Sequence, residues 1–382
     1  MKKTVAVLFG GSSQEHDVSV VSAQQLMDAA DVCSCNVIPV YLDFENRFMT
    51  GTSLRNVSSF RPAPPGLSEV AFAWGDDGPV LRAAGGTDNI PLDCVLPVFH
   101  GPFGEDGRVQ GYFELLGIPV TGFSASNSAI AMRKDVTKAL VSSEGVNVLE
   151  HVTVSEIDLT NEKNIESSIV ERFGFPVVIK PANLGSSIGV GIANDIETVL
   201  TLLRNVLRLD TLALIEPKVE NLKEYNISMV WSRGKVKFSA IESPKSGAEL
   251  LDFREKYLSE DGGGKKGAFK PSEGMLSLTR DIDPGMPDEF RQRIHEFARS
   301  AFLALGHRGA PRIDFMSDQK TGELWFNEIN PIPGSYGFFL WEAASEPLLY
   351  PELIDHLVHE AIKSSEKKFT DPVPEGARLF PR

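Results

Sequence analysis

One segment near the carboxyl end of the chain constrains the fold more than any other. Two short runs, residues 312–315 and 326–330, alternate charged or amide side chains with apolar ones on either side of a polar turn. A period of two is typical of strands with one buried face. A symmetric hairpin centred on Thr321 places Asp314 opposite Glu328. The same register places Arg312 opposite Asn330 and leaves the other face to Ile313, Phe315 and Ile329.

This register creates an electrostatic problem on the polar face. Two carboxylates that face each other across a strand pair, with Cβ atoms about 5 Å apart, repel and destabilise the hairpin. A positive charge between Asp314 and Glu328 would remove that repulsion. Carboxylate and amide oxygens, with Asn330 as the third group, suit a Mg²⁺ ion that is shared with substrate phosphates. The alternative is an exposed hairpin on which the charges are simply hydrated, and the residues alone leave both interpretations open.

The beginning of the chain predicts a doubly wound α/β layer. Residues 4–9 form a β-branched run that ends in two glycines, residues 18–30 have helical spacing, and residues 36–41 form a second apolar run. Strand, loop, helix and strand in this order open such a layer, where ligands bind at the carboxyl ends of strands. Residues 93–99 predict a further strand. Residues 44–90 are rich in Gly, Pro and Ser, and we interpret them as an elaboration of this domain.

The middle of the chain predicts a second kind of sheet. Two short apolar runs, residues 176–181 and 188–193, are separated by a loop that contains Gly185, Ser186 and Ser187. Runs this close predict antiparallel neighbours joined by a mobile hairpin loop. The 382 residues are enough for two or three domains. Helical patterns cover residues 135–144, 162–173 and 288–305, and further strands are predicted at 212–216, 225–232 and 235–242.

Composition narrows the function classes. Hydrophobic residues make up 42% and charged residues 24%, which excludes a disordered chain and a disulfide scaffold. The net charge of −14 does not steer the chain to nucleic acid or to an anionic membrane, so we expect neither as a partner. The three cysteines predict reduced thiols in a cytoplasmic protein. No apolar run approaches the roughly 18 residues that span a bilayer, and the start of the chain has no signal-peptide cleavage pattern.

Three further segments contain candidate binding groups. Residues 180–191 place small residues beside Lys180, which suits an anion, although an ordinary glycine-rich hairpin has the same composition. Glu15 precedes a predicted helix, where it either complements the helix dipole or points into a cleft to bind an ammonium group. His100 follows a strand end in a glycine-rich stretch, residues 100–111, and a lone histidine is more often structural than catalytic.

Together these segments resemble the D-alanine:D-alanine ligase family of the ATP-grasp superfamily. The resemblance extends over nearly the whole chain and is most specific in residues 10–19, 100–111, 180–191, 255–257, 312–315 and 327–334. It implies an α/β fold of the ATP-grasp type with three domains. These are an N-terminal substrate domain at 1–133, a central ATP-grasp domain at 134–224, and a C-terminal ATP-grasp and metal domain at 225–382.

The resemblance also implies roles for individual residues. The nucleotide-binding residues are Lys134, Lys180, Ser187, Glu216 near the adenine, Glu224 near the ribose, and Lys256 on the phosphates. The ligands of two Mg²⁺ ions, with Mn²⁺ as a substitute, are Asp314, Glu328 and Asn330. A hydrogen-bonded trio of Glu15, Ser186 and Tyr257 ties the glycine-serine loop to the substrate, while Arg312 and the Gly334 N–H stabilise the oxyanion. The substrate-binding positions are His100, Phe339 and Leu340, and residues 259–271 are the lid.

The implied reaction joins two amino acids through an acyl phosphate formed from ATP. One departure concerns the second amino acid, because Phe339 stands where the family has a serine that holds its carboxylate. Arg133 replaces an acid and Pro331 a small polar residue. Three hypotheses follow: a ligase that makes D-alanyl-D-alanine, a ligase with a different amine acceptor, and a nucleotide-binding regulator. The presence of the residues assigned to phosphate and metal binding disfavours the hypothesis of a regulator. The resemblance also suggests a homodimer, because members of the family often form one.

Overall fold

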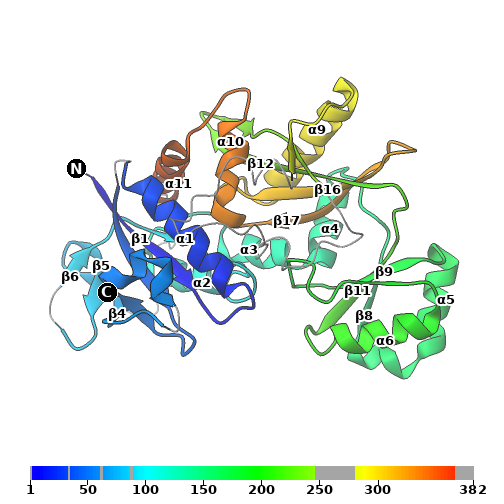
Figure 1. Ribbon diagram of the computed structural model, residues 1–382, viewed down its shortest axis with the longest axis horizontal. Helices are drawn as coiled ribbons and strands as arrows, with labels where there is room; N and C mark the ends of the chain where they lie inside the picture. The colour runs from blue at the N-terminus through cyan, green and yellow to red at the C-terminus, as the bar shows by residue number, and fades with distance from the viewer. Residues whose placement is uncertain (1, 33–34, 61–62, 87–88, 246–279, 366–382) are drawn as a thin grey trace, which may run out of the picture.

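The computed structural model describes residues 2–32, 35–60, 63–86, 89–245 and 280–365 (Figure 1). The predicted lid, Lys256 and Tyr257 lie outside the described residues. The described chain forms a mixed α/β fold around three sheets of seven, four and six strands, which confirms the predicted fold class. No helix in these ranges is long and apolar enough to cross a membrane.

The N-terminal sheet begins with the predicted parallel core. β1 (Lys3–Gly10) lies between β2 (Cys35–Leu42) and β7 (Cys94–Pro97) and pairs with both in parallel. The region that we interpreted as an elaboration extends the same sheet with antiparallel strands. These are β3 (Phe48–Thr50), β4 (Ser68–Gly75), β5 (Gly78–Ala83) and β6 (Asn89–Pro91).

Two helices from opposite ends of the sequence meet beside this sheet (Figure 1). α1 (His16–Ala30) confirms the predicted helix, and α11 (Tyr350–Ser365) packs against it. Leu26 and Met27 of α1 share one buried cluster with Leu357 of α11. The C-terminal helix therefore completes the core of the N-terminal sheet. α2 (Arg108–Leu116) and α3 (Ala125–Met132) follow β7 and lead to the rest of the molecule.

The four-stranded sheet has the order β10-β9-β11-β8 and carries its own core. β9 (Val177–Pro181) and β10 (Gly191–Ala193) pair in antiparallel fashion, which confirms the predicted hairpin. The helices α5 (Glu162–Arg172) and α6 (Ile196–Val206) lie beside this sheet (Figure 1). Both are amphipathic and supply buried side chains to its core. β8 (Val152–Ser155) and β11 (Leu212–Pro217) complete the sheet.

The third sheet carries the acidic hairpin. Its order is β15-β14-β12-β16-β17, and β13 pairs with β12. α9 (Asp288–Ala304), the predicted long helix, and α4 (Lys134–Ser143) contribute to its core. The division of the chain at residues 133/134 and 224/225 stays a prediction. The strands are β12 (Leu222–Ser232), β13 (Lys235–Phe238), β14 (Glu242–Pro244), β15 (Arg280–Ile282), β16 (Arg312–Asp318) and β17 (Leu324–Asn330).

The predicted register of the hairpin is confirmed at its functional end. Asp314 faces Glu328 and Arg312 faces Asn330 across β16 and β17. The register then shifts by one residue, so Phe315 pairs with Phe326. This bulge leaves one extra residue, Asn327, unpaired on β17 between Phe326 and Glu328. Bulges of this kind change the direction of side chains beside active sites.

Candidate active site

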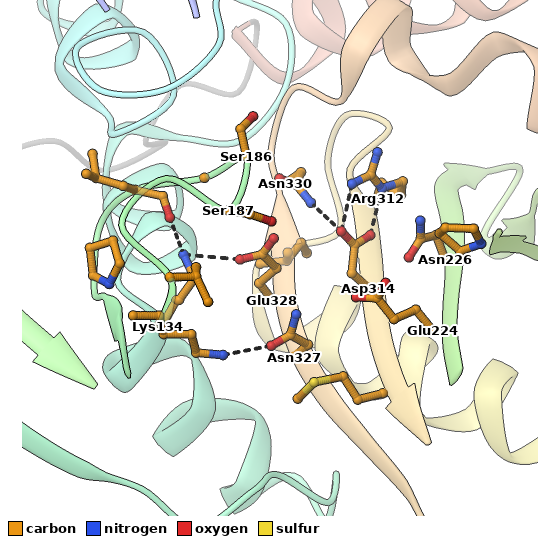
Figure 2. Close-up of a pocket in the computed structure, with 18 of the residues that line it drawn as sticks. Lys134, Ser186, Ser187, Glu224, Asn226, Arg312, Asp314, Asn327, Glu328 and Asn330 are labelled. Carbon is orange, nitrogen blue, oxygen red and sulfur yellow. Dashed lines mark hydrogen bonds and ion pairs between the residues drawn. The ribbon is translucent and has the colours of Figure 1, made fainter. Parts of the chain in front are cut away.

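One cavity of about 650 Å³ lies between the sheets and collects most of the predicted site. Its lining comes largely from the four-stranded and six-stranded sheets and from the loops that follow β1 and β7, and Figure 2 shows its central part. Phe339 and Leu340 do not line it. The predicted residues that do are Glu15, His100, Lys134, Lys180, Ser186, Ser187, Glu216, Glu224, Arg312, Asp314, Glu328, Asn330 and Gly334.

The opposed carboxylates each have a cationic partner (Figure 2). Arg312 donates from Nε and Nη2 to the two oxygens of Asp314 at 2.6 and 2.7 Å. The Asn330 amide donates to Asp314 at 3.1 Å, and Lys134 Nζ lies 3.1 Å from a Glu328 oxygen. In the described chain, the positive charge that the register demands is thus supplied by an arginine and a lysine.

The hydrated-hairpin alternative is wrong, because the Asp314 side chain is only 14% exposed. Burial raises the pKa of Asp314 above its usual range, Arg312 opposes that change, and Glu328 and Glu242 add to it. Asp314 is therefore buried beside a second acid, and Arg312 only partly offsets the resulting cost of its negative charge. Two carboxylates and the amide oxygen of Asn330 form a hard donor set that fits a divalent cation.

A buried lysine-glutamate cluster lies beside the hairpin. Glu216 is 2% exposed, and its two oxygens lie 2.8 Å from Lys138 Nζ and 2.7 Å from Lys180 Nζ. Burial alone would raise the pKa of Glu216, but the two lysine charges overcome it and lower the pKa to about 2. Lys180 also donates to Asn327 at 2.9 Å, which is the residue that the bulge turns toward the cavity. The Glu216 carboxylate therefore holds the lysines in place in this structure.

Sequence reasoning missed two members of this cluster. Lys138 follows Lys134 by one helical turn of α4, so the spacing places both on one face of the helix. That spacing was the available signal. Asn327 had no signal, because strict alternation would have turned it to the apolar face.

The glycine-serine loop joins the central sheet to the N-terminal sheet. Ser186 donates a short hydrogen bond to Glu15, although 171 residues separate them in the sequence. Glu15 lines the cavity and does not cap α1 through its side chain, so its carboxylate points into the cleft, and its role in binding an ammonium group stays a prediction. Ser186 and Ser187 both have positive φ, at 52° and 58°, a backbone conformation that non-glycine residues adopt at a cost. Lys134 Nζ donates to the Leu184 carbonyl at 2.6 Å and holds the base of the loop.

The N-terminal end of the cavity contains two buried titratable groups. His100 lies 3.1 Å from the Ser22 hydroxyl, and burial together with the charge of Arg312 lowers the pKa of His100 to about 4. Burial and the neighbouring Glu15 raise the pKa of Glu105 to about 8. Glu105 accepts hydrogen bonds from the backbone N–H groups of Gly101 at 2.7 Å and Ile332 at 3.1 Å. Glu105 therefore fixes the segment that leads to Gly334 against the loop that follows β7.

The segment after Gly334 shows where the unusual aromatic residues lie. Leu340 and Trp341 are buried, and the Leu340 carbonyl accepts from the Ala240 N–H at 2.9 Å. Tyr336 is 1% exposed and donates its hydroxyl to the Pro97 carbonyl at 2.6 Å. Tyr336 therefore cannot replace the missing serine as a donor to a substrate. Phe339 instead lies against Arg280, with 4.8 Å between the guanidinium carbon and the ring centre.

Comparisons with known proteins agree with this arrangement. The protein-family model "D-ala D-ala ligase N-terminus" matches residues 4–123. The family model "D-ala D-ala ligase C-terminus" matches residues 140–359. The chain is 31% identical to the D-alanine–D-alanine ligase of Chlorobium phaeovibrioides over 95% of this chain and 98% of that one. It is also 31% identical to the corresponding Thermoanaerobacter sp. enzyme, with 96% and 98% covered.

Solved structures show the same likeness. The D-Ala:D-Ser ligase VanG of Enterococcus faecalis superposes with a TM-score of 0.75 at 26% identity, covering 94% of this chain and all of that one. The D-alanine–D-alanine ligase of Coxiella burnetii has the same fold, with a TM-score of 0.77 at 23% identity and 96% and 95% covered. With both halves matched and the relatives spanned nearly end to end, the chain belongs to the D-alanine–D-alanine ligase family, a family of ATP-dependent ligases.

Proposed function

We propose that the protein joins D-alanine to a second amino acid, D-alanine itself in the simplest case, at the expense of ATP. The observation that carries this proposal is the position of the acidic hairpin in the cavity. Lys134 from α4 and Lys180 from the central sheet contact the hairpin, and the Glu15–Ser186 contact closes the N-terminal side. Phosphate-binding and ammonium-binding groups therefore flank one acidic centre.

The nucleotide lies, in this proposal, between the central and C-terminal sheets. Lys134 and Lys180 face its phosphates, Ser187 contributes from the loop, and Glu224 lines the cavity on β12, where a ribose hydroxyl can reach it. Glu216 lies near the base of the nucleotide and also positions Lys180. Asp314, Glu328 and Asn330 would hold two Mg²⁺ ions, or Mn²⁺ in their place. When bound, these cations neutralise the charge that develops on the transferred phosphoryl group.

The chain's own residues then position the reaction. Glu15 holds the ammonium group of the first amino acid, so its carboxylate points toward the hairpin. That carboxylate attacks the γ-phosphorus of ATP, and ADP leaves. The free amine of the second amino acid attacks the carbonyl carbon of the acyl phosphate, while Arg312 and the Gly334 N–H stabilise the oxyanion. Phosphate leaves, the amine loses a proton, and the peptide bond remains.

His100 and Lys256 complete the proposed assignments. His100 is neutral at pH 7 because its pKa lies near 4, so it contributes hydrogen bonding near the first substrate rather than charge. Lys256 as a phosphate ligand and Tyr257 as the third member of the Glu15–Ser186 group remain proposals from the family resemblance. So do a homodimer, a cytoplasmic location and a role in peptidoglycan synthesis.

A specific observation supports a second candidate for the acceptor. Phe339 has no hydrogen-bond donor at the position where the family has a serine, and Tyr336 is committed to the core. A ligase with the same first half-reaction and an acceptor other than D-alanine is therefore the alternative. Leu340 is buried, so only its backbone could contribute to acceptor binding.

Coupled ADP release with a panel of D-amino acids tests the proposal. We expect ADP formation that depends on D-alanine, on Mg²⁺ and on an acceptor amine, with the dipeptide identified by mass spectrometry. ADP release and a mixed dipeptide with another acceptor would favour the alternative. No ADP release with any D-amino acid would contradict both and support a regulator.

Glu15→Gln tests the proposed ammonium contact. The change keeps the shape of the side chain and removes its charge, and charged hydrogen bonds contribute about 1.5–3 kcal/mol. We expect the KM of the first D-alanine to rise about 10- to 100-fold. ATP affinity measured without amino acid should stay unchanged. An equal loss of ATP affinity would show that Glu15 has a structural role.

A further inference from the structure

We infer that Arg280, seated by Glu242 and Phe339, binds the carboxylate of the second amino acid. The inference rests on the proposed function and adds to it a residue outside the resemblance. Arg280 lines the same cavity as Arg312 and Gly334, and its side chain is 29% exposed. A partly exposed guanidinium in a cavity wall is the side chain best suited to pair with a carboxylate in two hydrogen bonds.

The geometry shows a guanidinium that is held at two points. Its Nη1 donates to both oxygens of Glu242, at 2.9 and 3.2 Å, and its central carbon lies over the Phe339 ring, 4.8 Å from the ring centre. Glu242 is fully buried and also accepts from the Asn226 amide at 2.9 Å. Because both bonds to Glu242 use Nη1, the Nη2 and Nε groups have no hydrogen bond to any residue that the structure describes.

The order of strands separates Arg280 from the nucleotide. Lys134 and Lys180 contact residues of β17, which is one edge of the sheet path, and β15 with Arg280 is the other edge. Asn226 on β12 pairs with Asp314 on one side and with Glu242 on the other. With strands about 4.8 Å apart, Glu242 lies about 10 Å from Asp314 on the side away from the lysines. An anion at Arg280 therefore belongs to the amino-acid acceptor rather than to the phosphates.

Phe339 gains a function in this arrangement. A ring that lies against the guanidinium limits its movement, and the contact itself contributes a favourable cation–π interaction. The missing hydroxyl is thus replaced by a cation that Phe339 helps to orient. A cavity wall that contains Arg280 selects an acceptor amine that also has a carboxylate over an amine that has none.

A competition experiment tests this inference. The protein is given ATP, D-alanine and D-alaninamide, and the ratio of D-alanyl-D-alanine to D-alanyl-D-alaninamide is measured. Both acceptors attack the same acyl phosphate, so the ratio reports acceptor recognition alone and does not depend on the amount of active protein. We expect D-alanine to be preferred and Arg280→Met to lower the ratio about 10- to 100-fold. Arg280→Lys keeps a cation beside Glu242 and should retain part of the preference.

The control is Arg291→Met. Arg291 has a similar side-chain exposure, 30%, and pairs with Asp283 at 2.6 Å, but it does not line the cavity. We expect its ratio to equal that of the unchanged protein. If Arg280→Met lowers both products equally and leaves the ratio unchanged, Arg280 is structural and the inference is wrong. If the unchanged protein forms neither product and releases no ADP, the proposed function itself fails.

Discussion

Asp314→Asn is expected to lower ATP turnover by about 10³-fold or more, with no loss of thermal stability. Removing one preorganised electrostatic group from an active site typically costs 10²–10³-fold, and Asp314 would contact both a cation and Arg312. The measurement is ADP release at saturating D-alanine and a range of Mg²⁺ concentrations. Glu328→Gln should show the same loss, because the two acids face each other.

Stability should behave differently from activity in this variant. The raised pKa of Asp314 means that its ionised form is less favourable in the folded protein than in the unfolded chain. Asparagine removes that cost at neutral pH and keeps the shape. Asp318→Asn on the same strand is the matched control, since Asp318 lies at the turn away from the cavity and should keep full activity. Full turnover in Asp314→Asn at modest Mg²⁺ would contradict the metal assignment.

Lys138→Met is expected to lower the free energy of unfolding by about 3–5 kcal/mol, because removing one partner of a buried ion pair leaves the other uncompensated. Lys138 is completely buried and lies 2.8 Å from Glu216, which would retain only Lys180. The loss is measured by urea denaturation. Lys163→Met on the exposed surface of α5 is the control and should change stability little. A change below about 1 kcal/mol would show that Lys180 alone suffices for Glu216.

The same cluster predicts a pH dependence. Because the folded pKa of Glu216 is about 2 instead of 4.5, its ionised form stabilises the fold above pH 4.5. This contribution is lost as the pH falls from 4.5 to about 2. Lys138→Met removes one of the two charges that lower the pKa, so the loss of stability should still begin near pH 4.5 but end closer to pH 4.5 and be smaller. Unfolding measured between pH 2.5 and 6 distinguishes the two curves.

Local alternation and spacing predict much of the fold. The register of Asp314 with Glu328 and the antiparallel pair of β9 and β10 follow from turn position and strand pattern, which are local properties. The bulge at Asn327 does not, because the extra residue becomes favourable only when Lys180 from another sheet binds its amide. The strand predicted at residues 235–242 is divided into β13 and β14 for a similar reason, since the chain crosses between them to a second pairing with β12.

Parts of the site depend on contacts between distant segments, which periodicity cannot detect. The sequence pattern alone makes Lys138 an ordinary helix residue, and its ion pair with Glu216 is visible only in the folded structure. Arg280 belongs to no recognisable sequence motif. Its partner Glu242 precedes it by 38 residues, and its partner Phe339 follows much later in the sequence. Such groups are found only when the strand order is known.

The packing of α11 against α1 has a consequence for the order of events during synthesis. The buried cluster of the N-terminal sheet contains Val5 and also Ala361, so its first and last members are made more than 350 residues apart. While the ribosome is still adding the later residues, the part of this apolar cluster that α11 covers is exposed. We therefore expect the loops that follow its strands, where Glu15 and His100 lie, to reach their final geometry only after α11 has emerged. A nascent chain arrested before Tyr350 should bind chaperones and fail to bind D-alanine.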